Sequence, residues 1–231
     1  MIVASICMRG GSKSVKGKNY RSLLGKPLMS YTIECAKKSK LVEDIVISSE
    51  SKLILDLSLK FLSSNKIYKR PTELASDKAS KWDVFKDLVL EYEKRNGVRI
   101  NYLVDLDVTV PRRLPEHIDD CIKLSKETNI DVVITGYEPE RNPYFNMMEE
   151  QVDGTFVIVK KMQKPIVCRQ DAPKVYSLTP AVYVIKREAL FKYKHWSEAT
   201  CKIYPIKREL AIDIDTEFDF KLVEFLMKND D

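Results

Sequence analysis

Short apolar runs alternate with segments of helical spacing through the first 135 residues, and this alternation constrains the fold more than any other feature. The apolar runs are nearly continuous, which is typical of strands buried on both faces of a sheet. They lie at residues 2–7, 44–49, 67–68, 102–106 and 131–135, and helical patterns lie between them at residues 27–38, 52–62, 81–95 and 115–127. The pattern predicts an α/β fold, in which a mostly parallel, twisted sheet carries helices on both faces.

The alternation stops between residues 137 and 176. This segment holds several prolines, an Asp153-Gly154 turn between two strand-like runs, and no long helical pattern. It predicts a small β-hairpin excursion from the main sheet, which is compatible both with a dimerisation element and with a free surface hairpin. Strand character returns at 182–185 and 201–206, and a helical pattern at 216–228 carries an apolar stripe of Phe218, Leu222, Phe225 and Leu226. We therefore expect a single domain over residues 1–231, with 137–176 inserted in it.

Composition argues against several classes of protein. A chain of 231 residues suits one α/β domain, and a net charge of +5 is too mild and too localised to indicate nucleic-acid binding. No apolar run approaches the roughly 20 residues needed to span a bilayer, and the first strand begins too early to leave room for a signal peptide. The five cysteines are odd in number and form no C-x-x-C pair, so neither a zinc site nor a disulfide framework is indicated. We expect reduced thiols in a cytoplasmic protein.

A basic, glycine-containing loop follows the first strand. Residues 1–40 hold nine Lys or Arg and one acidic residue, Glu34. A strand, such a loop and then a helix suit a polyphosphate, because backbone amides face the anionic oxygens and basic side chains neutralise them. The loop matches neither the P-loop of ATPases nor the dinucleotide fingerprint, and a solvated basic loop is the plain alternative. The candidate nucleotide-binding residues here are Arg9, Gly10, Gly11, Ser12, Lys16, Lys18 and Asn19.

Three further segments carry polar chemistry. Residues 70–80 read Arg-Pro-Thr-Glu-Leu-Ala-Ser-Asp-Lys-Ala-Ser, which also fits a helix N-cap with a structural Arg–Asp pair. Asp105 and Asp107 come at the carboxyl end of an expected strand, where open α/β sheets bind ligands; they point the same way and suit a metal site, or Asp105 anchors a loop. Asp213 and Asp215 also share a side in an extended segment, as hard-oxygen ligands of Mg²⁺ would. The alternative is that Asp215 or Thr216 caps the last helix.

These four segments, in this order, resemble the CMP-acylneuraminate cytidylyltransferase family, whose members include the CMP-sialic acid synthetases. The family patterns Arg-Pro-x-x-Leu-Ala-x-Asp-x-Ala-Ser and Ile-Asp-Ile-Asp-Thr-Glu are matched closely at residues 70–80 and 212–217, and the resemblance spans residues 2–226. It implies a Rossmann variant like that of the nucleotide-diphospho-sugar transferases. It also implies a homodimer in which the excursion meets the partner subunit.

The resemblance further implies a reaction and roles for individual residues. The reaction would join CTP and a nonulosonic acid, a nine-carbon 2-keto acid sugar, to give a CMP-sugar and pyrophosphate. Arg9 and Lys18 would bind phosphates, Asp213 and Asp215 would act catalytically by holding Mg²⁺, and Lys16 and Asn19 would support the nucleotide. The other implied nucleotide contacts are Arg70, Ala79 and Ser80, and the implied sugar contacts are Asp107, Thr109, Arg169, Gln170 and Tyr183. Among these, Arg169 is expected to bind a carboxylate of the acceptor, because its guanidinium fork matches the two oxygens.

Two departures from the family bear on the sugar. Asp107 replaces a glutamine of the sialic-acid enzymes and Ser177 replaces an arginine, while residues 142–146 look more like the branch that activates legionaminic-acid-type sugars. We therefore expect N-acetylneuraminate to be a poor substrate. The alternatives are the same reaction on pseudaminic acid or a 3-deoxy-octulosonate, a sugar-1-phosphate nucleotidyltransferase using another nucleotide, and a non-catalytic nucleotide-binding module. His117 and His195 fall in no constellation and are expected to be structural or exposed.

Overall fold

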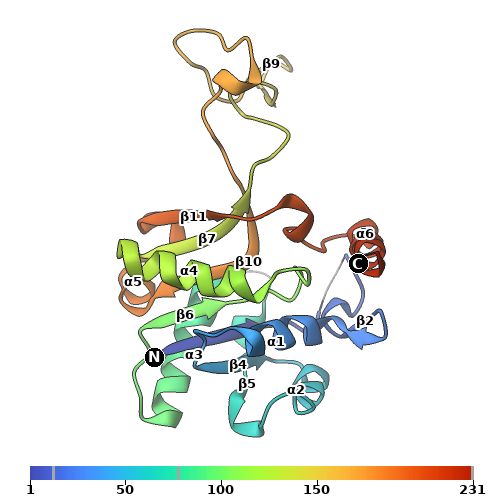
Figure 1. Cartoon of the computed structure of the whole chain (residues 1–231), viewed down its shortest axis with the longest axis vertical. Coiled ribbons are helices and arrows are strands. Elements are labelled where there is room, and N and C mark those ends of the chain that lie inside the picture. The colour runs from blue at the N-terminus through green and yellow to red at the C-terminus, as the bar shows by residue number, and fades with distance from the viewer. Residues whose placement is uncertain (12–13, 77–78, 230–231) are drawn as a thin grey trace.

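The computed structural model describes residues 1–11, 14–76 and 79–229, and within these ranges the main sheet has the strand order β11-β7-β10-β6-β1-β4-β5 (Figure 1). Its strands are β1 (Ile2–Cys7), β4 (Asp44–Ser49), β5 (Ile67–Lys69), β6 (Tyr102–Asp105), β7 (Val132–Tyr137), β10 (Ser177–Lys186) and β11 (Cys201–Pro205). Neighbouring strands run parallel except at β10, which is antiparallel to both β6 and β7. The expected mostly parallel α/β sheet is therefore confirmed.

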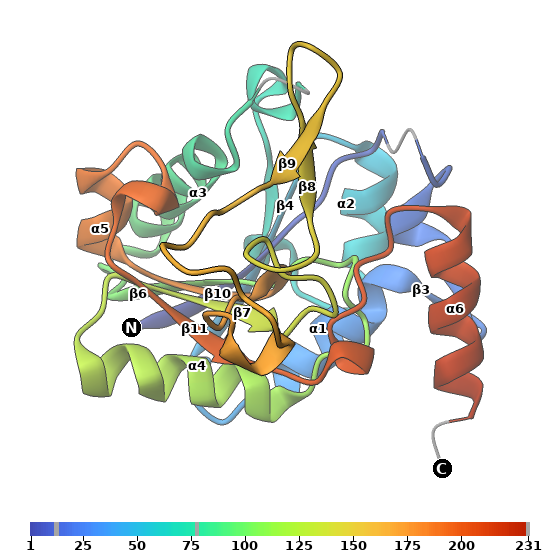
Figure 2. The same cartoon turned by 90° about the horizontal axis from the view of Figure 1, so that it is seen from above.

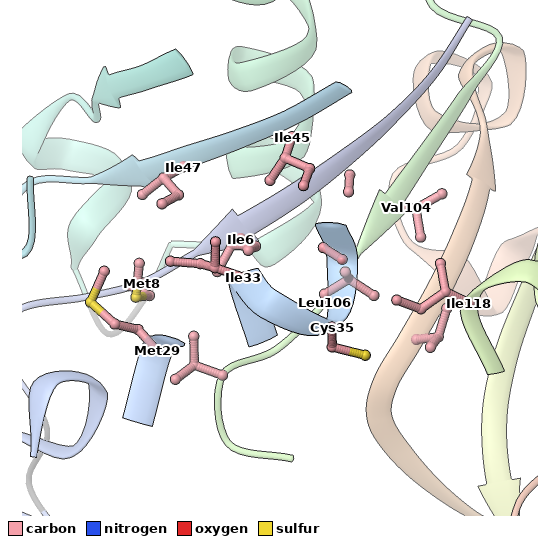
Figure 3. Packing of buried hydrophobic residues seen from close by; sticks show 14 of the residues in the cluster. Ile6, Met8, Met29, Ile33, Cys35, Ile45, Ile47, Val104, Leu106 and Ile118 are labelled. Carbon is pink, nitrogen blue, oxygen red and sulfur yellow. The ribbon is translucent and has the colours of Figure 1, made fainter. Parts of the chain in front are cut away.

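Helices cover both faces of the sheet (Figure 2). They are α1 (Leu28–Lys38), α2 (Lys52–Ser58), α3 (Lys81–Asn96), α4 (Pro115–Thr128), α5 (Arg187–Lys192) and α6 (Glu217–Lys228). Helices α1, α2 and α4 contribute to one hydrophobic core and α3 and α5 to the other. The alternation of strand side chains explains this division, because Ile2, Ala4 and Ile6 of β1 belong to the first core while Val3 belongs to the second. Figure 3 shows α1 packed on the strands through Met29, Ile33 and Cys35.

The expectations about α2 and α6 were wrong in detail. Helix α2 ends at Ser58, four residues before the expected end. In α6 the buried residues are Phe220 and Val223, whereas Phe218 and Phe225 of the expected stripe are 71% and 64% exposed. Helix α6 lies at the rim of the molecule and buries only a narrow face, so apolar spacing alone did not identify its contact side (Figure 2).

The segment between β7 and β10 forms the expected hairpin excursion. Its strands β8 (Met148–Glu150) and β9 (Phe156–Ile158) are antiparallel, and they form a separate two-stranded sheet. The turn between them uses Gly154 with φ +79°, a conformation that glycine adopts without steric penalty. Figure 1 shows the excursion extending well beyond the main sheet. No residue of 138–176 belongs to the hydrophobic cores found in the described ranges.

Smaller elements complete the chain. Strands β2 (Ser22–Leu23) and β3 (Lys26–Pro27) pair before α1, so Pro27 precedes the helix that was expected to begin with it. The short 3-10 helices are η1 (Lys18–Tyr20), η2 (Ser64–Lys66), η3 (Thr72–Ala75), η4 (Arg169–Asp171), η5 (Trp196–Glu198) and η6 (Arg208–Leu210). All five cysteines are free thiols, in agreement with the expectation. Among the helices in the part of the chain that the structure describes, none is long and apolar enough to cross a bilayer.

Candidate active site

The four sequence segments meet at one cleft of about 500 Å³ at the carboxyl ends of β1 and β6. Parallel neighbours such as β1 and β6 end at the same edge of the sheet, and the loops that follow them therefore converge. The expected residues that line the cleft are Arg9, Gly11, Lys18, Asn19, Arg70, Ala79, Asp107, Thr109, Asp213 and Asp215. Residues separated by two hundred positions in the chain thus share one surface.

The basic loop after β1 is held in place by hydrogen bonds at both of its ends. The amide of Gly10 donates to Glu50 Oε1 at 2.6 Å, and Asn19 Nδ2 donates to the carbonyl of Arg9 at 2.8 Å. Glu50, at the end of β4, was not anticipated from the sequence. Lys16 is exposed and does not line the cleft. Ser12, another expected nucleotide contact, lies outside the described residues.

Lys18 joins this loop to the aspartates near the end of the chain. Its Nζ donates to the carbonyl of Ile214 at 2.5 Å and lies 3.4 Å from Asp215 Oδ1. The Lys18 side chain is largely buried, so its ammonium group is held in one position in the cleft instead of moving freely in solvent. A triphosphate in the cleft would therefore meet an ammonium that is already positioned.

Asp213 and Asp215 lie in different surroundings. Asp213 is half-buried, and its Oδ1 is buried without a hydrogen-bond partner among the described residues. Burial raises the pKa of Asp213 to about 6, although the nearby hydroxyl of Thr109 opposes the shift. The side chain of Asp215 is 74% exposed. A carboxylate with one unsatisfied oxygen beside a second carboxylate fits a hard divalent cation, which would supply the missing partner.

The structure separates metal binding from helix capping. Thr216 Oγ1 accepts the amide of Asp219 at 3.2 Å, and Asp219 Oδ2 accepts the amide of Thr216 at 2.7 Å, which together form a capping box at α6. The carboxylate of Asp215 takes no part in this cap. Within the described ranges no group of three or more His, Cys, Asp or Glu could hold a metal. A cation here would therefore need phosphate and water oxygens to complete its coordination.

Arg70 and Ser80 hold the second segment against the sheet. Arg70 is buried, and its guanidinium donates from Nε to Ser48 Oγ at 3.2 Å and from Nη2 to the carbonyl of Ser48 at 3.0 Å. Ser80 Oγ accepts the amide of Trp82 at 3.1 Å, which confirms the prediction that segment 70–80 ends in the N-cap of a helix, here α3. The expected Arg–Asp pair involves Asp77, which is outside the described residues. Arg70 therefore presents a fixed positive charge in the wall of the cleft.

Lys81 connects the two aspartates of the third segment, and sequence reasoning missed it. Its Nζ lies 2.7 Å from Asp105 Oδ2 and 3.0 Å from Asp107 Oδ2. Burial acts to raise the pKa of Asp107, but the charge of Lys81 and hydrogen bonds from Lys81 and Thr109 outweigh it and lower this pKa to about 2. Burial raises the pKa of Asp105, which also accepts a hydrogen bond from Ser5. The pair points the same way, as expected, but toward an ammonium of the chain itself.

A second hollow of about 430 Å³, here called the aromatic pocket, adjoins the cleft and shares Lys81 and Asp107 with it. Its other lining residues are Ser80, Trp82, Phe85, Pro180, Tyr183, His195 and Trp196. Tyr183 was an expected sugar contact, whereas Trp82 and Phe85 lie in the expected helical segment 81–95 and had been given no role in binding. The two tryptophans and Phe85 give the pocket apolar walls beside a charged floor, an arrangement typical of small-molecule sites.

Two expected sugar contacts and two histidines lie outside the cleft. Arg169 and Gln170 form part of η4 in the excursion, are exposed, and line neither hollow of this chain; Arg169 Nη2 donates to the carbonyl of Pro139 at 2.8 Å. His117 Nδ1 accepts the amide of Leu114 at the start of α4, and exposed His195 caps η5. Both histidines have the structural or exposed positions expected of them, although His195 also borders the aromatic pocket.

Comparison with known proteins gives one consistent result. The family model "Cytidylyltransferase" matches residues 3–227. The chain is 37% identical to "Post-translational flagellin modification protein B" of Campylobacter coli, over 98% of this chain and 95% of that protein. It is 34% identical to "CMP-N,N'-diacetyllegionaminic acid synthase" of Campylobacter jejuni, over 98% and 94%. The solved structure of CMP:2-keto-3-deoxy-manno-octonic acid synthetase complexed with CTP covers 98% of both chains with a TM-score of 0.72; at 14% identity this likeness concerns the fold.

Proposed function

The chain belongs to the cytidylyltransferase family, and from that premise we propose that it transfers CMP from CTP to the anomeric hydroxyl of a nonulosonic acid and releases pyrophosphate. The observation that carries the proposal is the meeting of all four family segments at one cleft. That cleft holds the positive charge a triphosphate needs, and it opens beside a pocket of a size and polarity that suit a sugar acid.

Positioning and neutralisation of charge account for most of the chemistry. Arg9, Lys18 and Arg70 bind the triphosphate from the basic loop and the wall of the cleft, and Lys18 and Arg70 are already held by hydrogen bonds to backbone carbonyls. Donors fixed before the reaction stabilise the charge that develops on the leaving pyrophosphate without a reorganisation penalty. The acceptor hydroxyl attacks the α-phosphorus in line, since the aromatic pocket presents the sugar at the side of the cleft.

Asp213 and Asp215 are the residues that would hold Mg²⁺. When bound there, the ion supplies positive charge to the phosphates and lowers the pKa of a coordinated hydroxyl. The unsatisfied Oδ1 of Asp213 supports this assignment. Lys18, which touches Asp215 at 3.4 Å, keeps the second carboxylate near the first before any ligand arrives.

The acceptor we propose is a 5,7-diamino nonulosonate of the legionaminic acid type rather than N-acetylneuraminate. Two observations support it: the 34% identity to a protein named as a CMP-N,N'-diacetyllegionaminic acid synthase, and Asp107 and Ser177 in place of the glutamine and arginine of sialic-acid enzymes. The walls formed by Trp82, Phe85 and Trp196 suit the methyl groups of N-acyl substituents.

We also propose that the active form is a homodimer joined through the excursion. Its apolar side chains are exposed in the single chain, among them Met148, Val152, Phe156 and Val167. Exposed apolar side chains clustered on one small element favour burial against a partner. Because Arg169 and Gln170 line neither hollow of their own chain, their predicted contact with the sugar depends on that second copy.

A pyrophosphate-release screen of each nucleoside triphosphate against a panel of nonulosonic acids, 3-deoxy-octulosonate and sugar 1-phosphates tests the function. We expect release with CTP and a diamino nonulosonate, and slower release with N-acetylneuraminate. Equal turnover with UTP, GTP or ATP, or turnover confined to sugar 1-phosphates, would contradict the proposed reaction. Comparable kcat/KM for legionaminate and N-acetylneuraminate would leave the reaction intact and overturn only the choice of sugar.

A further inference from the structure

Lys81 stands at the junction of the two hollows. Among the described Lys and Arg residues, it lines both the cleft and the aromatic pocket, and the other basic side chains of the cleft do not reach the pocket. The nucleotide and the acceptor must meet at this junction for the anomeric hydroxyl to reach the α-phosphorus. The charge at Lys81 is therefore placed where the bond forms.

The ammonium of Lys81 is held but not saturated. Its Nζ donates to Asp107 Oδ2 at 3.0 Å and forms an ion pair with Asp105 Oδ2 at 2.7 Å. The rings of Phe85 and Tyr183 lie 5.6 and 5.8 Å from Nζ and restrict the side chain from the pocket side. The Lys81 side chain remains 44% exposed and an ammonium has three donors, so a ligand that enters the junction can accept a hydrogen bond from it.

Asp107 is not available in the same way. Its Oδ1 accepts from the amide of Thr109 at 3.2 Å and from Thr109 Oγ1 at 3.0 Å, while its Oδ2 faces Lys81. Both carboxylate oxygens are thus engaged within the chain. What this part of the site offers to an acceptor is the ammonium of Lys81, which can only donate hydrogen bonds.

The chemistry of the proposed acceptor supplies a group that matches. In a 2-keto acid sugar the carboxylate is bonded directly to the anomeric carbon that carries the attacking hydroxyl. The carboxylate carbon is two bonds from the attacking hydroxyl oxygen. When that oxygen reaches the α-phosphorus, the carboxylate therefore lies at the junction. The N-acyl substituents are at carbon 5 of the ring and carbon 7 of the side chain, several bonds from the anomeric carbon, so an acceptor with its anomeric hydroxyl at the junction has room for them in the aromatic pocket. A cation is needed at the junction, and Arg169, the expected carboxylate partner, lines neither hollow of this chain.

We propose that Lys81 binds the carboxylate of the acceptor sugar and that Asp105 and Asp107 position its ammonium for this contact. This inference rests on the proposed function. It changes the role given to Asp107 by the sequence: Asp107 contributes to acceptor selection through Lys81 instead of touching the sugar. An acceptor without a negative charge next to its anomeric carbon loses the contact.

Steady-state kinetics of Lys81→Gln on two acceptors tests the proposal. One acceptor is the nonulosonic acid that the parent uses best, and the other is the same sugar with its carboxylate converted to a carboxamide. Loss of a hydrogen bond to a charged group corresponds to roughly 10- to 100-fold. We expect kcat/KM for the acid to fall by that factor, kcat/KM for the carboxamide to stay within about twofold, and KM for CTP to be unchanged. Lys94→Gln, an exposed lysine of the same helix, should behave like the parent on both acceptors.

Each other result has a defined meaning. Equal losses on acid and carboxamide, or a raised KM for CTP with an unchanged KM for the acid, would overturn the assignment of Lys81. If Lys81→Gln fails to fold because Asp105 loses its partner, the double variant Lys81→Gln/Asp105→Asn takes its place, since it removes both charges. The ratio of kcat/KM for the acid to kcat/KM for the carboxamide then tests the proposal in the same way. A parent that releases no pyrophosphate with any nonulosonic acid overturns the proposed function, and with it the inference, before Lys81 is compared.

Discussion

The cleft and the excursion are opposite kinds of surface on one chain. The cleft draws on segments from residue 9 to residue 215, and its charged groups are tied to the protein: Lys18 to Ile214, Arg70 to Ser48, and Lys81 to two aspartates. The excursion is a local hairpin whose large apolar side chains are exposed, with Phe156 at 58%. Within the described ranges the excursion shares no hydrophobic core with the sheet, although Arg208 forms an ion pair with Glu140 near its base.

The two regions differ in how their side chains are stabilised. A cleft whose donors are already positioned binds anions without first ordering its own side chains. A hairpin without a core gains little from folding alone, since a two-stranded ribbon is marginally stable in water. In the homodimer proposed above, each chain builds its nucleotide site by itself and the partner copy stabilises the excursion. Each prediction below perturbs one side of this contrast.

The largest expected effect is on the cleft side, with Asp213→Asn. Removing a charged metal ligand should lower kcat by about 100-fold or more. Thermal stability at pH 7 without metal should instead rise, because the substitution removes a half-buried carboxylate whose pKa is raised to about 6. Kinetics with CTP and the best acceptor, together with melting curves in a chelator, measure both quantities.

The pH dependence provides the control for this variant. A carboxyl whose pKa rises from 3.8 unfolded to about 6 folded binds its proton more tightly in the folded state. Its ionisation therefore lowers the stability of the parent as pH rises from about 4 to 6, by at most about 3 kcal/mol. The gain of Asp213→Asn should vanish near pH 4, and the parent's kcat/KM should fall below pH 6 as the metal ligand protonates. A variant that is active like the parent would remove the metal from the mechanism.

On the excursion side, Phe156→Glu should weaken self-association. A buried phenylalanine contributes about 1.5–3 kcal/mol at an interface, so the Kd for the dimer should rise by roughly 10- to 100-fold. Sedimentation velocity over a concentration series measures this. Leu90→Glu replaces an equally exposed apolar residue on α3 and should leave association unchanged. A parent that is monomeric at tens of micromolar would contradict the proposed dimer outright.

The sequence predicted the strands of the main sheet better than the direction of β10 and the buried face of α6. Continuous apolar runs identified the strands, and the ends of those strands brought the four segments together. Apolar runs carry no direction, however, and the antiparallel course of β10 was therefore not foreseen. Helix α6 buries Phe220 and Val223 because it meets the body at its rim, and spacing alone favoured Phe218 and Phe225.

The candidate site shows the same division. Residues that act through local pattern, such as Arg9 and Asp213, could be found from their segments. Lys81 and Glu50 could not, because their roles come from partners 24 and 40 residues away that only folding brings near. For Arg169 the local pattern was present, but the excursion that carries it extends away from the main sheet, so Arg169 lines neither hollow of this chain (Figure 1).

A smaller effect separates two neighbours at the edge of the cleft. Thr216→Ala removes the N-cap of α6 and should lower the free energy of unfolding by about 1 kcal/mol. Asp215→Asn leaves that cap intact and should lower activity with no change in melting temperature, since its carboxylate is exposed. Denaturant titrations and kinetics on both variants distinguish them. If Thr216→Ala and Asp215→Asn lowered the free energy of unfolding equally, Asp215 would be a capping residue of α6.

The smallest expected effect comes from Gly154→Ala in the excursion. Gly154 has φ +79° with no atom within 4 Å of a new Cβ, so the substitution adds only backbone strain, about 1–2 kcal/mol. Because the hairpin shares no core with the sheet, we expect that strain to loosen the hairpin locally and to change the main melting transition by less than about 0.5 kcal/mol.

Gly17→Ala is the matched control, because Gly17 in the basic loop also has a positive φ, +64°. There a new Cβ would lie 2.7 Å from the ring of Tyr20, which is packed against the larger core. We expect this variant to lower the main transition by at least the same 1–2 kcal/mol and to impair CTP binding. Hydrogen exchange of hairpin amides, compared with amides of β1, measures the two responses separately. If Gly154→Ala lowers the main transition as much as Gly17→Ala does, the excursion and the sheet unfold as one unit, and the contrast between the two regions fails.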